Sequence, residues 1–172
     1  MKKVFFLFVI FLLTIQLQAQ FSKATLQATG LTCAMCSNAI NKALQKVPFV
    51  ESVKSDIKNS SFDIVFKKGQ EINIDALKDA VEDAGFSVGS LKLTGNFAEM
   101  MVENDKHVKI GNETFHFLNV SNQVLNGEKT ITVLDKNFVT EKAFKKYSNA
   151  TKMSCMQTGK TASGERIYHV TI

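Results

Sequence analysis

Apolar and polar residues follow two different periods along residues 23–91, and this pattern predicts an ordered series of strands and helices. Apolar residues at every second position are typical of half-buried strands, and apolar residues three and four apart are typical of amphipathic helices. In chain order the pattern predicts a strand at 23–28, a helix at 35–47, strands at 50–57 and 61–66, a helix at 74–83 and a strand at 86–91. This order is the split arrangement of a ferredoxin-like α+β sandwich, in which two helices cover one face of an antiparallel sheet.

The residues between these strands and helices support the same element boundaries. Gly30 follows the first predicted strand as a turn former, and Pro48 stops the first helix from continuing. Gly85 stands just beyond the second helix, where glycine commonly ends a helix. The apolar periods and the turn residues therefore indicate the same fold for this half of the chain.

From about residue 92 onward the pattern is rich in short strands. It predicts strands at 108–110, 114–120, 129–134, 151–157 and 166–172, and one helix at 141–147 with Thr140 as its N-cap. With residues 91–97 as a first strand, this half would resemble a five-stranded barrel of the oligonucleotide/oligosaccharide-binding (OB) type. We therefore expect two domains, at 22–91 and 92–172, with a linker or long loop at 96–106.

Residues 1–20 have the layout of a secretory signal peptide. Lys2 and Lys3 precede an apolar run at 4–13, polar residues follow, and cleavage is expected near Ala19. The run is about half as long as a segment that crosses a bilayer core, and no later segment is apolar enough to span one. The expected mature protein is periplasmic or secreted and has no membrane span.

The charge of the chain excludes one class of partner. The formal net charge is +5, and Lys2 and Lys3 of the expected signal peptide contribute two of these charges. The remaining excess is weak and scattered over residues 91–172, without a basic stripe. We therefore expect no nucleic-acid partner.

The strongest chemical signal is the segment Gly30-Leu31-Thr32-Cys33-Ala34-Met35-Cys36 between the first strand and the first helix. Two residues between the cysteines let both sulfurs face the same small volume, a spacing that recurs in metal and redox sites. Cys36 falls in the first turn of the predicted helix, where backbone N–H groups and the helix dipole favour an anion. The position therefore favours the thiolate, which is the form that binds metal.

Two thiolates define the kind of ion that this site would hold. Thiolate is a soft ligand that suits Cu(I), Hg(II) and, with further donors, Zn(II). A structural zinc ion normally takes four ligands, and no His or Asp lies within the loop to supply the other two. We therefore expect Cys33 and Cys36 to bind Cu(I), with Hg(II) and Zn(II) as alternatives.

This motif in this order of elements resembles the heavy-metal-associated (HMA) domain of copper chaperones, copper-transporting ATPases and the periplasmic mercury-binding protein. The resemblance covers residues 22–91. It implies that Cys33 and Cys36 bind the metal and that a metal-transport or metal-accepting protein is the partner. The chain has Leu31 where the family usually has Met, an apolar substitute of similar volume. It has Gly85-Phe86 where cytosolic chaperones tend to have a Lys, and an aromatic there is more like the ATPase-linked and bacterial domains.

The primary prediction is a non-enzymatic metallochaperone-like protein that sequesters or transfers a soft ion. Three alternatives use the same residues differently. Cys33 and Cys36 could form a simple disulfide in an oxidising compartment. They could serve a thiol-disulfide oxidoreductase, although the aromatic-Cys-Gly-Pro-Cys neighbourhood is missing. The first domain could also only sense metal, while residues 91–172 dock to a partner protein.

A second group of soft donors lies near the end of the chain. Three cysteines are an odd number, so at least one thiol has no partner for an intramolecular disulfide. Met153, Cys155 and Met156 lie close together, and His169 could face them from the last strand. These donors suit Cu(I), but Met and Cys are also common core residues, and core packing is the expectation. His107 and His116 are expected at the surface or a sheet edge, without a partner.

Overall fold

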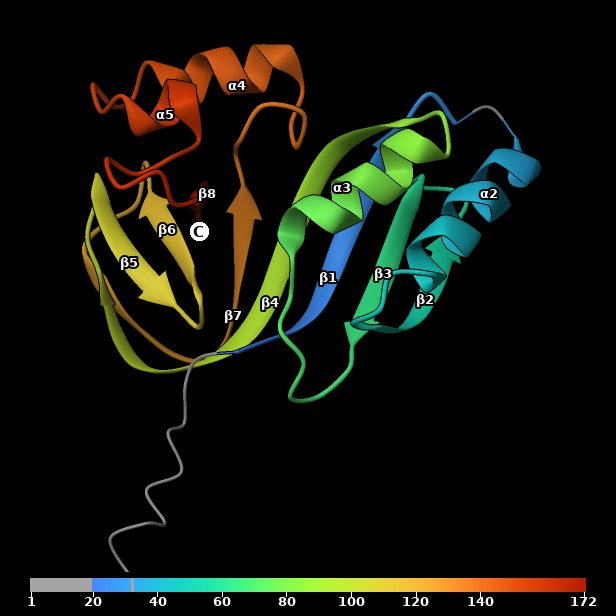
Figure 1. Ribbon diagram of the computed structural model, residues 1–172, viewed down its shortest axis with the longest axis horizontal. Coiled ribbons are helices and arrows are strands. Elements are labelled where there is room, and N and C mark those ends of the chain that lie inside the picture. The colour runs from blue at the N-terminus through green and yellow to red at the C-terminus, as the bar shows by residue number, and fades with distance from the viewer. Residues whose placement is uncertain (1–19, 32) are drawn as a thin grey trace, which may run out of the picture.

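The computed structural model describes residues 20–31 and 33–172 (Figure 1). The expected signal peptide, apart from Gln20, and Thr32 of the cysteine loop lie outside the described residues. Within the described part, no helix is both long enough and apolar enough to cross a membrane.

The first part of the chain has the predicted order of elements. Its strands and helices are β1 (Gln20–Thr29), α2 (Ala34–Gln45), β2 (Val50–Asp56), β3 (Ser61–Phe66), α3 (Ile74–Asp83) and β4 (Ser87–Val102). The four strands pair antiparallel in the order β2-β3-β1-β4. Helices α2 and α3 lie side by side on one face of this sheet (Figure 1). The ferredoxin-like prediction is confirmed for this part, which we call the ferredoxin-like half.

The apolar periods of the two helices explain this packing. Helix α2 buries Ile40 and Leu44 against the sheet, and α3 buries Leu77 and Val81 on the same side. Asn73 caps α3 by accepting a hydrogen bond from the backbone N–H of Ala76, at 3.2 Å.

Strand β4 overturns the expected linker. The strand runs without interruption to Val102, and the turn that follows has ended by Lys106, where the next strand begins. The boundary expected at residue 91 therefore falls inside a strand, and the linker predicted at 96–106 is wrong. Strand β4 pairs with β1 on one side and with β7 (Gln123–Val133) on the other, so it belongs to both halves of the molecule.

The second half adds further strands to the same sheet. They are β5 (Lys106–Ile110), β6 (Glu113–Phe117), β7 and β8 (Ile167–Thr171). The described strands form one eight-stranded sheet in the order β2-β3-β1-β4-β7-β8-β6-β5, in which only β6 and β8 pair parallel. This order is open, with β2 and β5 at its edges, so the structure shows a β-rich extension and no closed OB-like barrel among the described residues.

Two helices cover the second half at one end (Figure 1). Helix α4 (Glu141–Ser148) confirms the predicted helix, and Thr140 caps it by accepting a hydrogen bond from the Ala143 N–H, at 3.4 Å. The strand predicted at 151–157 is wrong, because this segment ends in the short helix α5 (Cys155–Thr158). Gly159 ends α5 in the left-handed conformation, at φ 64°.

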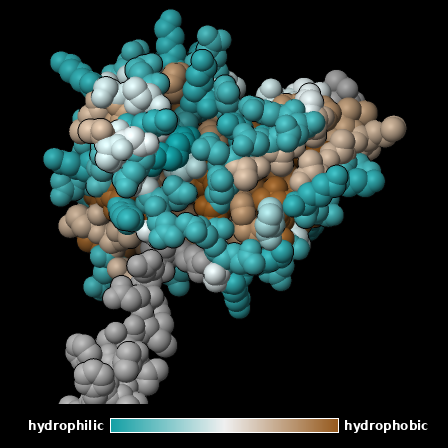
Figure 2. Space-filling view, in the orientation of Figure 1, coloured by the Kyte–Doolittle hydropathy of each residue, from teal (hydrophilic) through white to brown (hydrophobic). Residues whose placement is uncertain are grey.

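One hydrophobic core runs through both halves. The ring of Phe21 packs edge to face against Phe97 and Phe115, with centroids 6.1 and 5.6 Å apart. A smaller cluster of Leu118, Leu134 and Met156 lies under α4 and α5. Hydrophilic side chains cover most of the face seen in Figure 2, while apolar side chains show at the end that carries α2.

Candidate functional site

Cys33 and Cys36 meet at the start of α2. Cys33 is the N-cap of the helix, and its Sγ accepts a hydrogen bond from the backbone N–H of Cys36, at 3.4 Å. The two Sγ atoms are 2.7 Å apart. Cys33 is exposed and Cys36 is half-buried. The predicted convergence of two sulfurs at an accessible helix N-terminus is therefore observed.

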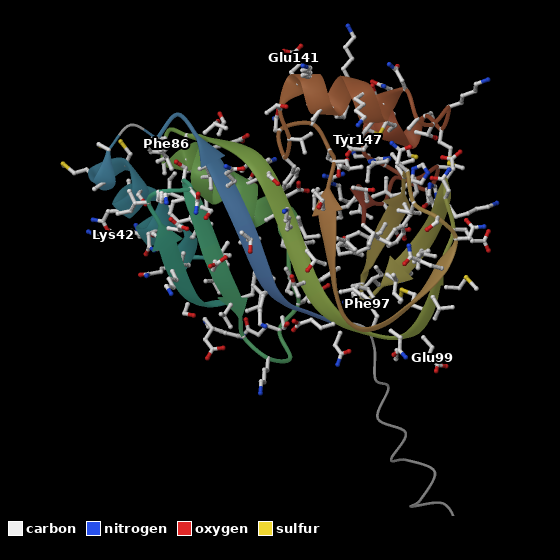
Figure 3. All side chains as sticks on the ribbon, turned by 180° about the vertical axis from the view of Figure 1, so that it is seen from behind. Lys42, Phe86, Phe97, Glu99, Glu141 and Tyr147 are labelled. Atoms are coloured by element: carbon white, nitrogen blue, oxygen red, sulfur yellow. The ribbon has the colours of Figure 1, made fainter. Side chains whose placement is uncertain are left out.

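The residues around this loop fix its path. Gly30 has φ 82°, a conformation that only glycine adopts readily. Leu31 and Phe86 are partly buried and pack against the core. Figure 3 places Phe86 at the end of the molecule that carries the β1–α2 loop. Apolar contacts with the core thus hold the loop in place, while its sulfurs remain accessible from solvent.

The donors at this loop are few. Among the described residues, the one group of three or more His, Cys, Asp and Glu side chains with metal-binding geometry does not include Cys33 or Cys36. Met35 between them is 83% exposed. The loop therefore presents two thiol ligands to an ion and leaves its outer side accessible to a further donor.

The three histidines lie next to one another on the second half of the sheet. His107 on β5 pairs with His116 on β6, and His116 pairs with His169 on β8. Cross-strand partners point to the same face of a sheet. The rings of His107 and His116 are 4.7 Å apart, and those of His116 and His169 are 5.2 Å apart. The expectation that His116 is a surface or edge residue is wrong, since it is fully buried, whereas His107 is exposed on an edge strand.

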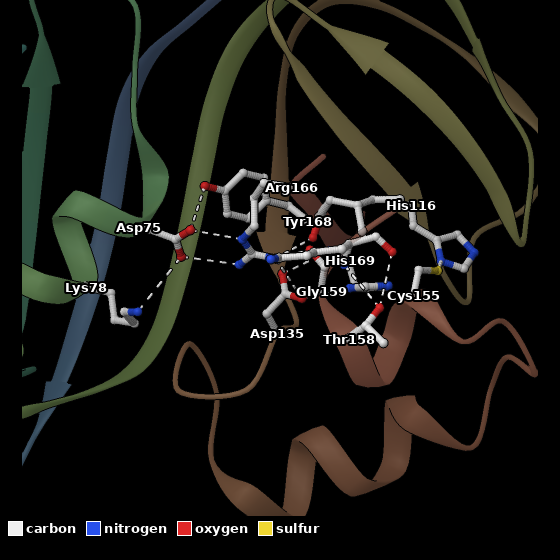
Figure 4. Close-up of polar contacts among 12 residues, drawn as sticks. Asp75, Lys78, His116, Asp135, Cys155, Thr158, Gly159, Arg166, Tyr168 and His169 are labelled. Carbon is white, nitrogen blue, oxygen red and sulfur yellow. Dashed lines mark hydrogen bonds and ion pairs between the residues drawn. The ribbon is translucent and has the colours of Figure 1, made fainter. Parts of the chain in front are cut away.

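Cys155, at the start of α5, lies next to His116 (Figure 4). Its Sγ is 3.6 Å from Nε2 of His107 and 3.5 Å from Nδ1 of His116. The ligand atoms of these three residues all lie within 4.8 Å of one another. Cys155 is buried, as the core-packing expectation required, but its sulfur faces two imidazoles.

Carboxylates hold two of the imidazoles in place. Asp105 lies 2.9 Å from Nε2 of His116. Burial lowers the pKa of His116 to about 4, although Asp105 opposes this effect. Burial also raises the pKa of the Cys155 thiol. At neutral pH the His116 ring is therefore uncharged and can offer Nδ1 as a lone-pair donor.

His169 has a similar arrangement. Its Nδ1 is 2.7 Å from Oδ1 of Asp135, and its backbone N–H donates to Oδ2 of the same carboxylate at 3.0 Å. Its Nε2 is buried and has no hydrogen-bond partner among the described residues. His169 does not pair with residues 153–156 as a neighbouring strand, because this segment ends in α5; it lies beside His116, whose Nδ1 faces Cys155. The register of β5, β6 and β8 is needed to place the three histidines in one row.

The two methionines of this segment have different surroundings. Met156 is buried against Leu118 and Leu134, as expected for a core residue. Met153 is 38% exposed and lines a cavity of about 500 Å³ together with His107 and Cys155.

The sequence contained one signal for the cluster of His107, His116 and Cys155 that the sequence analysis missed. If the turn at Gly111 and Asn112 is read as a two-residue hairpin, His107 and His116 fall opposite each other.

A ferredoxin-like half that carries two thiols at a helix N-terminus defines a metal-binding domain of the CxxC type. Residues 25–87 match the family described as the heavy-metal-associated domain, and this part of the chain is an HMA domain. The predicted family resemblance is thus confirmed for this segment.

Individual relatives match the same segment. The chain is 27% identical over 67 residues to copper chaperone CopZ of Staphylococcus aureus, which covers 39% of this chain and 97% of CopZ. It is 27% identical over 75 residues to the probable copper-transporting ATPase HMA5 of Arabidopsis thaliana, which covers 44% of this chain but only 7% of the ATPase. The solved yeast copper transporter domain Ccc2a, studied in apo and Cu(I)-loaded states, is 26% identical, with a TM-score of 0.35, and covers 38% of this chain and 88% of the domain.

Proposed function

We propose that this protein binds Cu(I) through the thiolates of Cys33 and Cys36 and sequesters the ion or passes it to another protein. The observation that carries the proposal is the pair of sulfur atoms 2.7 Å apart at the exposed start of α2. Thiolate sulfur is the ligand that Cu(I) prefers, and an ion with two protein ligands can accept a third from a partner. Hg(II) and Zn(II) remain the alternative ions.

The accessibility of the loop supports transfer. Cys33 and Met35 are exposed, so thiols of an accepting protein can approach the ion while it is still bound. No substrate other than the ion is needed for this role, and we propose that the protein is not an enzyme. The similarity to CopZ supports the same interpretation, since CopZ is named as a copper chaperone.

We also propose that the protein acts outside the cytoplasm. The support is the charge and hydropathy pattern of residues 1–20, with two lysines ahead of an apolar run. In such a compartment the thiols need a reduced environment or a bound ion to avoid oxidation to a disulfide.

The test is a Cu(I) titration under reducing conditions in competition with a chromogenic Cu(I) chelator. Because Cys155 is a third thiol, the parent protein for this experiment is the Cys155→Ala variant. We expect it to bind one ion tightly, and we expect Cys33→Ser and Cys36→Ser together to remove that binding. Met35→Ala is the matched control, since it alters the exposed residue between the cysteines without removing a thiol. Equal affinity with and without the two cysteines would refute the proposal.

The oxidoreductase alternative gives a different result with the same proteins. A catalytic cysteine pair would reduce or oxidise a model disulfide with turnover that the double Ser substitution abolishes. A metal carrier would react at most once with each protein molecule. Repeated turnover, together with weak Cu(I) binding, would favour the oxidoreductase.

A further inference from the structure

We propose that His107, His116 and Cys155 form a second metal site, which binds one Cu(I) ion through two imidazole nitrogens and one thiolate sulfur. The three residues lie outside residues 25–87, on β5, β6 and α5. Figure 1 shows α5 and α2 at opposite ends of the molecule, so this site is separate from Cys33 and Cys36. It therefore does not rest on the proposed role of the first cysteine pair.

The spacing of the donors fits one ion between them. Bonds from such metals to imidazole nitrogen or thiolate sulfur are about 2.0–2.3 Å long, so three donors placed trigonally around one ion lie about 3.5–4.0 Å apart. The Cys155 sulfur is 3.6 Å from His107 Nε2 and 3.5 Å from His116 Nδ1. A small approach of the two imidazoles completes the triangle, because all three ligand atoms already lie within 4.8 Å of one another.

The groups behind the donors are those of a built metal site. A histidine that binds metal usually directs its other ring nitrogen to a carboxylate, which fixes the orientation of the ring. Asp105 does this for His116, at 2.9 Å. Asp135 does the same for the neighbouring His169, at 2.7 Å. The buried Nε2 of His169, next to His116, has no hydrogen-bond partner among the residues that the structure describes.

Charge and coordination number favour Cu(I) over Zn(II). One thiolate balances the charge of a monovalent ion, and two neutral imidazoles add further donors without adding charge. Three ligands satisfy Cu(I), whereas zinc normally requires four. On binding, the Cu–S bond forms as the S–H bond of Cys155 breaks, and the proton passes to solvent without any change in oxidation state.

An ion can enter this site without unfolding of the protein. His107 is exposed on the edge strand β5. A cavity of about 500 Å³ opens beside it and is lined by His107, Cys155 and Met153. Met153 brings a thioether, a further soft donor, to the entrance of the site.

The test uses the full chain with Cys33→Ser and Cys36→Ser, which removes the first site. Titration with Cu(I) against a chelator should show one remaining tightly bound ion, and X-ray absorption should show two nitrogen neighbours and one sulfur neighbour. Adding His107→Gln should remove this ion. Because His107 is exposed, this substitution leaves the fold intact, whereas Cys155→Ala, which should have the same effect, alters a buried residue. Lys109→Gln on the same strand is the matched control and should retain the ion.

Several outcomes would overturn the proposal. One is the absence of a tightly bound Cu(I) ion in the double Ser variant while its thermal unfolding is unchanged. Another is retention of the ion in both the His107→Gln and the Cys155→Ala variants. Tighter binding of Zn(II) than of Cu(I) in competition would overturn the choice of ion. Failure of the Cys33 and Cys36 proposal would appear only in the Cys155→Ala series, so the two proposals fail separately.

Discussion

Arg166 holds Asp75 with two hydrogen bonds, from Nε to Oδ2 at 2.9 Å and from Nη2 to Oδ1 at 3.2 Å (Figure 4). The two residues are 91 positions apart. Asp75 lies at the start of α3 in the ferredoxin-like half, and Arg166 directly precedes β8 in the second half. Tyr168 adds a third hydrogen bond to the same carboxylate, at 3.1 Å. One carboxylate thus joins the two halves that the sequence had suggested were separate domains.

The first prediction concerns this connection. Asp75→Asn removes the charge opposite Arg166 and should lower the free energy of unfolding by about 1–3 kcal/mol, since hydrogen bonds to charged groups in partly buried sites contribute in this range. Urea unfolding measures the change. Asp79→Asn is the matched control, because the exposed Asp79 forms an ion pair with Lys78 on the same helix, and its loss should change stability by less than about 1 kcal/mol. If the two variants lowered the free energy of unfolding equally, the Asp75 contacts would contribute no more to stability than the ion pair of Asp79.

The second prediction is the dependence of stability on pH. Burial by itself raises the pKa of Asp75, but the hydrogen bonds and charge of Arg166 outweigh this effect and hold the pKa below its usual value of 3.8. A carboxyl whose pKa is lowered by folding stabilises the protein above its unfolded pKa, and this contribution is lost as the pH falls through the folded pKa. The difference in unfolding free energy between wild type and Asp75→Asn should therefore be constant near pH 6 and shrink below about pH 4. Urea midpoints at several pH values test this, and a difference that grows on acidification would contradict it.

The ferredoxin-like half could be predicted because its signals are local. The apolar period of α3 gave the helix at 74–83, and Gly85 marked its end. The convergence of Cys33 and Cys36 was predictable for the same reason, since two residues between the thiols place both sulfurs at one helix start.

The second half could not be predicted to the same extent, because its structure depends on contacts between distant residues. Strand β4 passes residue 97 through a shift in register against β7, with Glu99 at φ 48°, and Gly95 and Asn96 just before it are more typical of a turn than of the middle of a strand. Helix α5 has only four residues, too few to show a helical period, so alternation of Met153 and Cys155 suggested a strand. The histidine row required the register of β5, β6 and β8 together.

The third prediction separates the conformation of the cysteine loop from general stability. Gly30→Ala places a side chain at φ 82° and should destabilise the fold by about 1 kcal/mol. Because Gly30 fixes the path of the loop, the variant should also bind Cu(I) at Cys33 and Cys36 more weakly. Gly69→Ala is the control, since Gly69 has φ 73° in open space but lies away from the loop. With both glycine variants made in the Cys155→Ala background, a chelator competition should show weaker Cu(I) binding for Gly30→Ala and unchanged binding for Gly69→Ala. An equal loss of Cu(I) affinity in both glycine variants would mean that lower fold stability, and not the path of the loop, causes the effect.

The fourth prediction tests whether the two halves unfold as one unit. Phe21 on β1 is 8% exposed and packs against Phe97 of β4 and Phe115 of β6, so its ring contacts residues from both parts of the sheet. Phe21→Ala should lower the free energy of unfolding by about 3–5 kcal/mol, as expected for removing a buried aromatic side chain. Because the core is continuous, far-UV circular dichroism and the fluorescence of Tyr147 and Tyr168, both in the second half, should report one coincident transition. Phe49→Ala is the matched control, since Phe49 packs against Phe66 within the ferredoxin-like half. If Phe21→Ala gave two separate transitions while Phe49→Ala left the second half intact, the halves would be independent domains despite the strand they share.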